Sequence, residues 1–223
     1  KVYMMMTLQE AIKQRHSVRR YVHKPLSAEI VKTLQNKIDE CNAEGGLHIQ
    51  LVTNETRAFT GLFSYGKFSG VENYIVMVGK KADDLDERVG YYGEQLVLLA
   101  QTLGLNTCWA GLSYRRVDEA YSVGDDEKLT CMIALGYGAT QGHKRKSKTA
   151  EQVSNISSDS PEWFRNGVEA ALLAPTAINQ QKFSFTLLPN EQDTEDKPKV
   201  LAKRGFSMVG YTKMDIGIAR LHF

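Results

Sequence analysis

The chain has little of what marks several large protein classes. It holds only 3 cysteines in 223 residues, Cys41, Cys108 and Cys131, and no two of them form a Cys-x-x-Cys pair. An odd number of scattered cysteines fits a reducing compartment best. No apolar run approaches the roughly 20 residues that cross a bilayer, and residues 1–6 lack the apolar core of a signal peptide. We therefore expect a cytoplasmic protein that has no membrane as a partner.

The sequence also lacks an excess of one charge and the common catalytic motifs. Its 28 basic and 26 acidic residues give a formal net charge of +2, and the one basic run, 143–148, is short, so we expect no nucleic-acid partner. The five histidines show no metal-ligand spacing and no His-Glu-x-x-His, so we expect no metal. No Gly-x-Ser-x-Gly nucleophile motif is present either.

Length and composition predict one globular domain, 1–223. The 42% hydrophobic and 24% charged residues are ordinary for a chain that builds one sizeable core. A weak internal repeat divides it, because residues 47–55 match residues 183–191 and both follow an amphipathic helix. We interpret this as pseudo-repeat halves of about 7–157 and 158–223, with coincidence as the alternative.

Hydrophobic periodicity predicts alternating helices and strands. The continuous apolar run 74–79 is typical of a central strand covered on both faces, and 85–103 is the longest and most apolar helical pattern. Two helices have clear starts, Thr7 with Glu10 and Ser27. The remaining predictions are helices at 116–121 and 214–223, a helix that starts with Pro161 at its first position and is ended by Pro175, strands at 47–53, 129–135 and 183–187, and a solvated acidic turn at 191–196.

A basic segment, Arg15-His16-Ser17-Val18-Arg19, follows the first predicted helix. If the chain is extended there, the side chains of Arg15, Ser17 and Arg19 point to one side. Two guanidiniums and a hydroxyl then form a fork suited to a phosphate dianion. The alternative is that these basic residues only complement the dipole of the helix that they follow. The chain thus offers a phosphate grip without an acid, base or nucleophile, which suggests that a cofactor supplies the chemistry.

Two further stretches suit a flat heterocycle. In the first, residues 174–181, Pro175 ends a helix while Thr176, Asn179 and Gln181 supply a hydroxyl and two amides. In the second, residues 104–112, a glycine after an apolar segment lets a backbone N–H approach a ring closely. A polar helix-to-strand loop and ordinary core packing, respectively, explain the same residues.

The segment 54–70 mixes glycines with aromatic residues and loses all periodicity. It is either a loop that covers something flat or a surface segment without such a role. The side chains that we select to line a substrate cavity are Phe63, Tyr65 and Phe68.

Taken together and in this order, the motifs resemble the nitroreductase-like flavoproteins. The matching stretches are Arg15-His16-Ser17-Val18-Arg19-x-Tyr21, Gly104-Leu105-Asn106-Thr107-Cys108-Trp109-Ala110-Gly111, Ile133-Ala134-Leu135-Gly136-Tyr137-Gly138 and Ala174-Pro175-Thr176-Ala177-x-Asn179-x-Gln181. The resemblance implies an α+β fold with a mostly antiparallel central sheet flanked by helices. It also implies FMN as cofactor, NAD(P)H as co-substrate, ping-pong hydride transfer to a nitroaromatic, quinone or similar small acceptor, and a homodimer.

By that likeness, the chemistry takes place at the flavin N5 and no side chain is catalytic. The residues that would bind the phosphate are Arg15, His16, Ser17 and Arg19, with Lys146 and Lys148 in place of a late basic ligand. Those that would contact the ring or its N5 edge are Trp109, Ala110, Gly111 and Leu112, together with Pro175, Thr176, Ala177 and Asn179 from the second subunit.

The sequence departs from the usual family pattern in one respect, and in this respect it resembles a duplicated subgroup of these proteins. The Ala-Pro-Thr motif lies in the second half of the chain, whereas familiar members carry it in the first half. Alternative functions are a flavin-binding or sensory module without turnover, another reaction of the family such as reductive dehalogenation, and a binding protein for a phosphate ligand other than a flavin.

Overall fold

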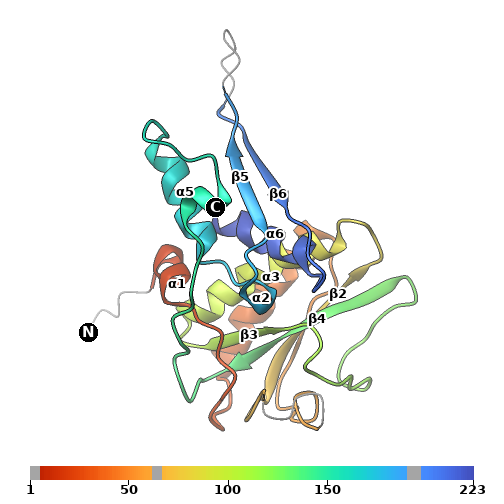
Figure 1. The fold of residues 1–223 in the computed structure, drawn as a ribbon. Helices are drawn as coiled ribbons and strands as arrows, with labels where there is room; N and C mark the ends of the chain where they lie inside the picture. Colours follow the sequence, from red (N-terminus) through yellow and green to blue (C-terminus); the bar gives the residue numbers. More distant parts are fainter. Residues whose placement is uncertain (1–5, 62–66, 190–196) are drawn as a thin grey trace. The chain divides into compact units, whose positions relative to one another are not determined.

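The computed structural model describes residues 6–61, 67–189 and 197–223. The chain divides into two compact units, the first formed by Lys1–Leu85 and Tyr92–Lys144 and the second by Asp86–Tyr91 and Arg145–Phe223. The α+β class is confirmed, with an antiparallel central sheet in the first unit and helices in both (Figure 1). The single-domain organisation and its halves stay a prediction.

The sheet of the first unit has four antiparallel strands in the order β1-β2-β4-β3. Their bounds are β1 Gln50–Val52, β2 Asn73–Lys80, β3 Asn106–Ala110 and β4 Glu127–Gly136. Strand β2 pairs with β1 on one side and β4 on the other, and every residue in it except Lys80 is buried. The prediction of a central strand from the apolar run 74–79 is therefore confirmed.

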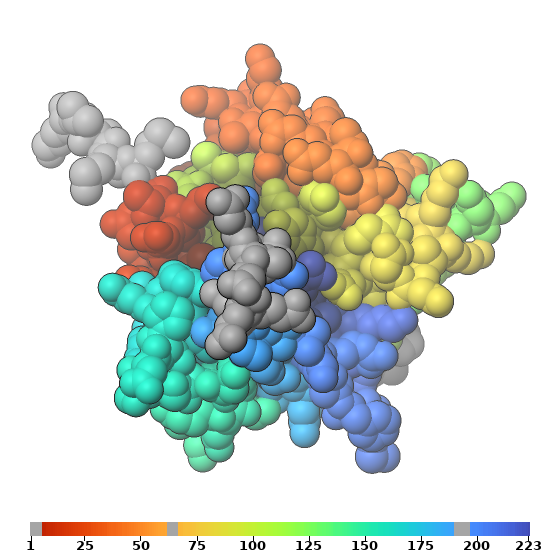
Figure 2. All heavy atoms as spheres, turned by 90° about the horizontal axis from the view of Figure 1, so that it is seen from above, coloured from red at the N-terminus to blue at the C-terminus, as the bar shows by residue number. Residues whose placement is uncertain are grey.

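Three helices begin in the first unit, and the predicted caps are present in two of them. Helix α1, Leu8–Gln14, starts with a capping box in which Thr7 and Glu10 exchange hydrogen bonds, and α2, Ala28–Gly45, is capped by Ser27. Helix α3 spans Leu85–Thr102. Helix α2 packs on α3, and at their contact the Cys41 thiol donates to the carbonyl of Tyr92 at 3.8 Å. Figure 2 shows the two helices side by side in orange and yellow.

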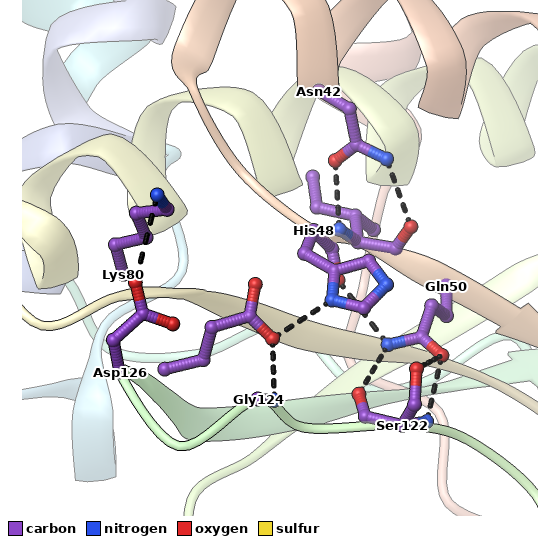
Figure 3. A network of polar contacts seen from close by, with 9 residues as sticks. Asn42, His48, Gln50, Lys80, Ser122, Gly124 and Asp126 are labelled. Atoms are coloured by element: carbon purple, nitrogen blue, oxygen red, sulfur yellow. Dashed lines mark hydrogen bonds and ion pairs between the residues drawn. The ribbon is translucent and has the colours of Figure 1, made fainter.

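Polar contacts fix the connection between α2 and β1 (Figure 3). His48 Nδ1 lies 2.9 Å from Glu127 Oε2, and Gln50 Nε2 donates to the carbonyl of Ser122 at 2.7 Å. The Asn42 amide bonds both the N–H and the C=O of the residue after His48, at 2.7 and 3.0 Å. These bonds tie the end of α2 to the start of β4.

The second unit joins a hairpin to helices. Its elements are α4 Ala150–Val153, α5 Glu162–Leu172, the 3-10 turn η1 Ala177–Asn179, β5 Phe183–Leu187, β6 Val200–Arg204 and α6 Thr212–His222. Strands β5 and β6 pair antiparallel (Figure 1). The Phe223 ring stacks on Phe185 with centroids 4.7 Å apart and lies 5.8 Å from Phe164, so the end of the chain belongs to this unit's core.

Some local predictions were wrong. Residues 116–121 form a turn instead of a helix, since this short segment lacks the length that stabilises an isolated helical pattern. The strand predicted at 47–53 is regular only from Gln50 to Val52, and Leu47 makes a single bridge to Gly79. Strand β6 and the short helix α4 were not predicted. The acidic turn 191–196 lies outside the described residues. In the described part of the chain, no helix is both long and apolar enough to cross a membrane.

Candidate functional site

The basic segment after α1 is extended, as its predicted fork requires. The N–H of Val18 donates to Thr107 of β3 at 3.0 Å, and the N–H of Tyr21 donates to Ser69 at 2.9 Å. One residue further on, Val22 donates to Tyr137 at 2.9 Å. Backbone bonds on both sides hold the segment straight, so alternate side chains face opposite sides.

All three fork side chains influence the Cys108 thiol. Burial raises the pKa of the Cys108 thiol, whereas the charges of Arg19 and Arg15 and a hydrogen bond with Ser17 act to lower it. The hydrogen bond needs the Ser17 hydroxyl next to the sulfur, whereas the two charges act over a longer range. Alternation along an extended chain puts Arg15, Ser17 and Arg19 on one side of the segment, and this arrangement stays a prediction.

The two arginines of the fork differ in environment. Arg15 is only 7% exposed, and its Nε lies 3.7 Å from Oε1 of Glu94, a fully buried residue of α3. Glu94 also accepts a hydrogen bond from the Trp109 indole at 2.9 Å. Arg19 is exposed, and no carboxylate of the described residues forms an ion pair with it. Its charge is thus open to an anion from solution. The ring of His16 lies against the preceding turn, with Nδ1 2.9 Å from the carbonyl of Gln14.

The end of β3 provides the second predicted stretch. Trp109 is anchored by its bond to Glu94, and Ala110 is buried in the strand. Gly111 follows the strand, and the side chain of Leu112 is 78% exposed. A single exposed leucine is ordinary on a protein surface, so the assignment of Leu112 to the ring stays a prediction.

The aromatic segment is only partly described, because Phe63 and Tyr65 lie outside the described residues. The Phe68 ring packs edge-on against Phe59, with centroids 4.9 Å apart. Phe68 lines a cavity of about 820 Å³ together with Arg20. Since Arg20 alternates with its neighbour Arg19, this cavity lies on the side of the extended segment away from the fork.

In the second unit, the loop after α5 carries the third stretch in an unusual backbone conformation. Pro175 is buried, and Thr176 and Ala177 are half-buried. Ile178 and Asn179 have φ angles of 47° and 59°, values that non-glycine residues rarely adopt. The Asn179 amide donates to the carbonyl of Lys146 at 2.7 Å, while its buried Oδ1 has no hydrogen-bond partner among the described residues.

The buried Gln181 holds the far end of this loop. Its amide donates to the carbonyl of Leu172 and to Ser147, both at 3.0 Å, and its Oε1 accepts the N–H of Lys148 at 2.9 Å. The Lys148 ammonium donates to the carbonyl of Gln181 at 2.6 Å, and burial lowers the pKa of this lysine, with the Lys182 charge acting in the same direction. Lys148 thus holds the loop, whereas the Lys146 side chain is exposed.

Three residues of these surroundings were missed from the sequence. Glu94 joins Arg15 to Trp109, and Arg145 donates to the carbonyls of Leu172 and Ala174 at 3.0 and 2.6 Å. Asp215 of α6 accepts the N–H of Ala177 at 2.9 Å and the amide of Gln180 at 2.6 Å. The available signal was an acid next to the apolar residues of a helical pattern: Asp215 is the one acid of α6, and Glu94 lies just before the apolar second half of α3. No cluster of three metal-ligating side chains occurs within the described ranges.

Comparison with known proteins agrees with the fold. No curated protein matches the chain. Among solved structures, a "putative nitroreductase" of Thermotoga maritima is 23% identical with a TM-score of 0.64, and the match covers 100% of this chain and 84% of that one. A "putative nitroreductase" of Desulfovibrio desulfuricans, solved in complex with FMN, is 17% identical with a TM-score of 0.53 over 69% of this chain and 98% of that one.

A further solved structure, a "putative NADH oxidase" of Clostridium acetobutylicum, is 16% identical with a TM-score of 0.51 over 68% of this chain and 99% of that one. The family model described as "Putative TM nitroreductase" matches residues 7–223, nearly the whole chain. The chain therefore belongs to this nitroreductase family.

Proposed function

We propose that the chain is an FMN-dependent oxidoreductase that passes hydride from NAD(P)H to a nitroaromatic, quinone or similar small acceptor in a ping-pong cycle. Family membership supports the reaction class, and the solved relatives include one in complex with FMN and one called an NADH oxidase. The cofactor, when bound, supplies the hydride chemistry, so the protein has to bind and orient it. In this proposal the enzyme works as a cytoplasmic homodimer.

The observation that carries the proposal is the extended backbone of the basic segment, because alternation along it puts Arg15, Ser17 and Arg19 on one face. Two guanidiniums and a hydroxyl suit the phosphate of FMN chemically. Arg15 already faces Glu94, so we assign the main charge contact to the exposed Arg19. In our proposal His16 adds to this site, together with Lys146. Lys148 remains a candidate there, although its ammonium holds Gln181.

The residues proposed for the ring also fit a flavin. The buried Oδ1 of Asn179, which has no partner among the described residues, suits a ring N–H donor. We assign the ring or its N5 edge to the residues Trp109, Ala110, Gly111, Leu112, Pro175, Thr176, Ala177 and Asn179. Phe68 stays a candidate for lining the acceptor cavity.

The test compares Arg19→Ala with its neighbour Arg20→Ala. Arg19→Ala removes a charged hydrogen bond of about 1.5 to 3 kcal/mol, so it should weaken FMN about 10- to 100-fold. Riboflavin, which lacks the phosphate, should bind Arg19→Ala as it binds the wild type. Arg20→Ala, whose side chain faces the other side, is the matched control and should bind both flavins normally.

Titration calorimetry with both flavins measures these affinities. Equal losses for FMN and riboflavin, or equal losses in the two variants, would contradict the phosphate assignment. Addition of NADH or NADPH under anaerobic conditions then distinguishes an enzyme from a binding module. Only in an enzyme should one of the two nucleotides bleach the absorbance of the bound flavin.

A further inference from the structure

Asp215 is a buried acid whose two oxygens both serve the loop after α5. It lies in the first turn of α6 and is 3% exposed. Oδ1 accepts the N–H of Ala177 at 2.9 Å, and Oδ2 accepts the side-chain amide of Gln180 at 2.6 Å. Burial raises the pKa of Asp215 to about 6, and these two hydrogen bonds only partly oppose that rise. The fold therefore keeps a carboxylate where ionisation is costly.

Neighbouring charges do not explain why the acid is there. Arg204 of β6 donates to the hydroxyl of Thr212 at 3.4 Å, and Arg220 of α6 pairs with Glu87. No salt bridge of the described residues includes Asp215, and no charged group is among the causes that shift its pKa. The carboxylate is therefore used for its two acceptor oxygens, both directed at the loop.

The loop that it holds is strained. Ile178, Asn179 and Gln181 have φ angles of 47°, 59° and 44°, within four consecutive residues. Non-glycine residues in this region cost on the order of 1 to 3 kcal/mol, asparagine less than the others, and persist where surrounding contacts enforce them. For Ile178 the cost is high because its side chain is β-branched, and this side chain is 77% exposed, so packing does not offset it.

The contacts that enforce this conformation lie on both sides of the strained residues. Asp215 fixes Ala177 before them and the Gln180 side chain within them, while the Gln181 N–H donates to the Thr176 hydroxyl at 3.1 Å. Between these anchors lies Asn179, with its buried oxygen unpartnered among the described residues. Strain of this kind is typical of a segment shaped for a ligand.

We propose that Asp215 is a positioning residue, whose carboxylate fixes Ala177 and Gln180 so that the Asn179 carbonyl oxygen is held ready for an N–H donor of the flavin ring. This inference rests on the proposed FMN function. Asp215 thus affects the contact between Asn179 and the flavin ring, and not the contacts to the phosphate. Loss of the carboxylate therefore weakens FMN and riboflavin by the same factor, unlike Arg19→Ala.

Asp215→Asn tests the proposal, with Asp159→Asn, an exposed aspartate of the same unit, as the matched control. The amide keeps the shape but provides only one acceptor for two donors. We expect faster hydrogen exchange at the Ala177 amide in the absence of flavin, and about tenfold weaker binding of both FMN and riboflavin. Asp159→Asn should change neither measurement.

Gln180→Met provides a second route if Asp215→Asn does not fold. It removes one donor to the carboxylate and leaves Asp215 in place, so both flavins should again weaken by one common factor. Wild-type affinities kept by the folded variants would overturn the positioning role, as would a loss limited to FMN. A wild-type chain that binds neither flavin would instead overturn the proposed function itself, so the two failures are distinguishable.

Discussion

Asp215 makes a prediction about stability that does not depend on any ligand. Its pKa rises from the ordinary 3.8 to about 6 on folding, because burial disfavours the charged form. A group with a raised pKa contributes stability that is fully present below the unfolded value and is lost as the pH rises through the folded value. Two pKa units at about 1.4 kcal/mol each amount to about 3 kcal/mol.

Asp215→Asn isolates this contribution, since the amide does not titrate. The free energy of unfolding of Asp215→Asn minus that of the wild type should rise by about 3 kcal/mol between pH values below 3.8 and above 6. The asparagine offers one acceptor instead of two, which lowers the stability of the variant by the same amount at every pH. The test is therefore the change of the free-energy difference with pH and not its absolute value. Other titrating groups cancel in the subtraction.

One tryptophan in each unit makes the assay specific. Trp109 lies in β3, whereas Trp163 lies in α5, 5.9 Å from the ring of Phe164. In a Trp109→Phe background, fluorescence during urea unfolding reports on the second unit alone. A difference that stays flat with pH, or falls as the pH rises, would refute the view that Asp215 is a desolvated carboxylate in the folded chain.

Three further changes test other contacts. Gly217→Ala places a methyl group of α6 against the carbonyl of Glu87 in α3 and should lower the free energy of unfolding by about 1 to 3 kcal/mol, measured by urea titration. An unchanged urea midpoint would show that α6 can move away from Glu87 without cost. Burial raises the pKa of Glu127, but a backbone amide and the His48 ring outweigh it and lower the pKa. His48→Ala should therefore cost about 1 kcal/mol at neutral pH, and the loss should shrink as the pH falls below 4.5; a pH-independent loss would contradict this. Glu94→Gln removes the charge opposite the buried Arg15 guanidinium and should lower the free energy of unfolding by about 3 kcal/mol, measured by Trp109 fluorescence. An unchanged free energy of unfolding would argue against a stabilising ion pair between Arg15 and Glu94.

Local sequence signals predicted the elements well where they act over short distances. The capping box of Thr7 and Glu10, the cap at Ser27 and the buried strand at 74–79 were all readable, because each depends on residues close in sequence. The extended backbone that the fork requires is present, whereas the shared face of its side chains stays a prediction.

Contacts between distant residues were not predictable in the same way. Nothing near Ile178 in the sequence indicates a left-handed backbone. One of the contacts that hold this conformation comes from Asp215, which bonds the N–H of Ala177 from 38 positions further along the chain. The burial of Arg15 against Glu94 likewise depends on the packing of α3. Strand β6 was missed because its residues, three apolar ones followed by Lys203 and Arg204, do not alternate between apolar and polar types.

The central claim, that the chain binds FMN and turns it over, is tested most directly by one visible absorption spectrum. The purified protein is incubated with FMN, dialysed, and recorded anaerobically before and after addition of NADH or NADPH. We predict that the flavin bands survive dialysis and bleach with at least one of the two nucleotides. A colourless protein after dialysis, or flavin bands that neither nucleotide bleaches, would contradict the account.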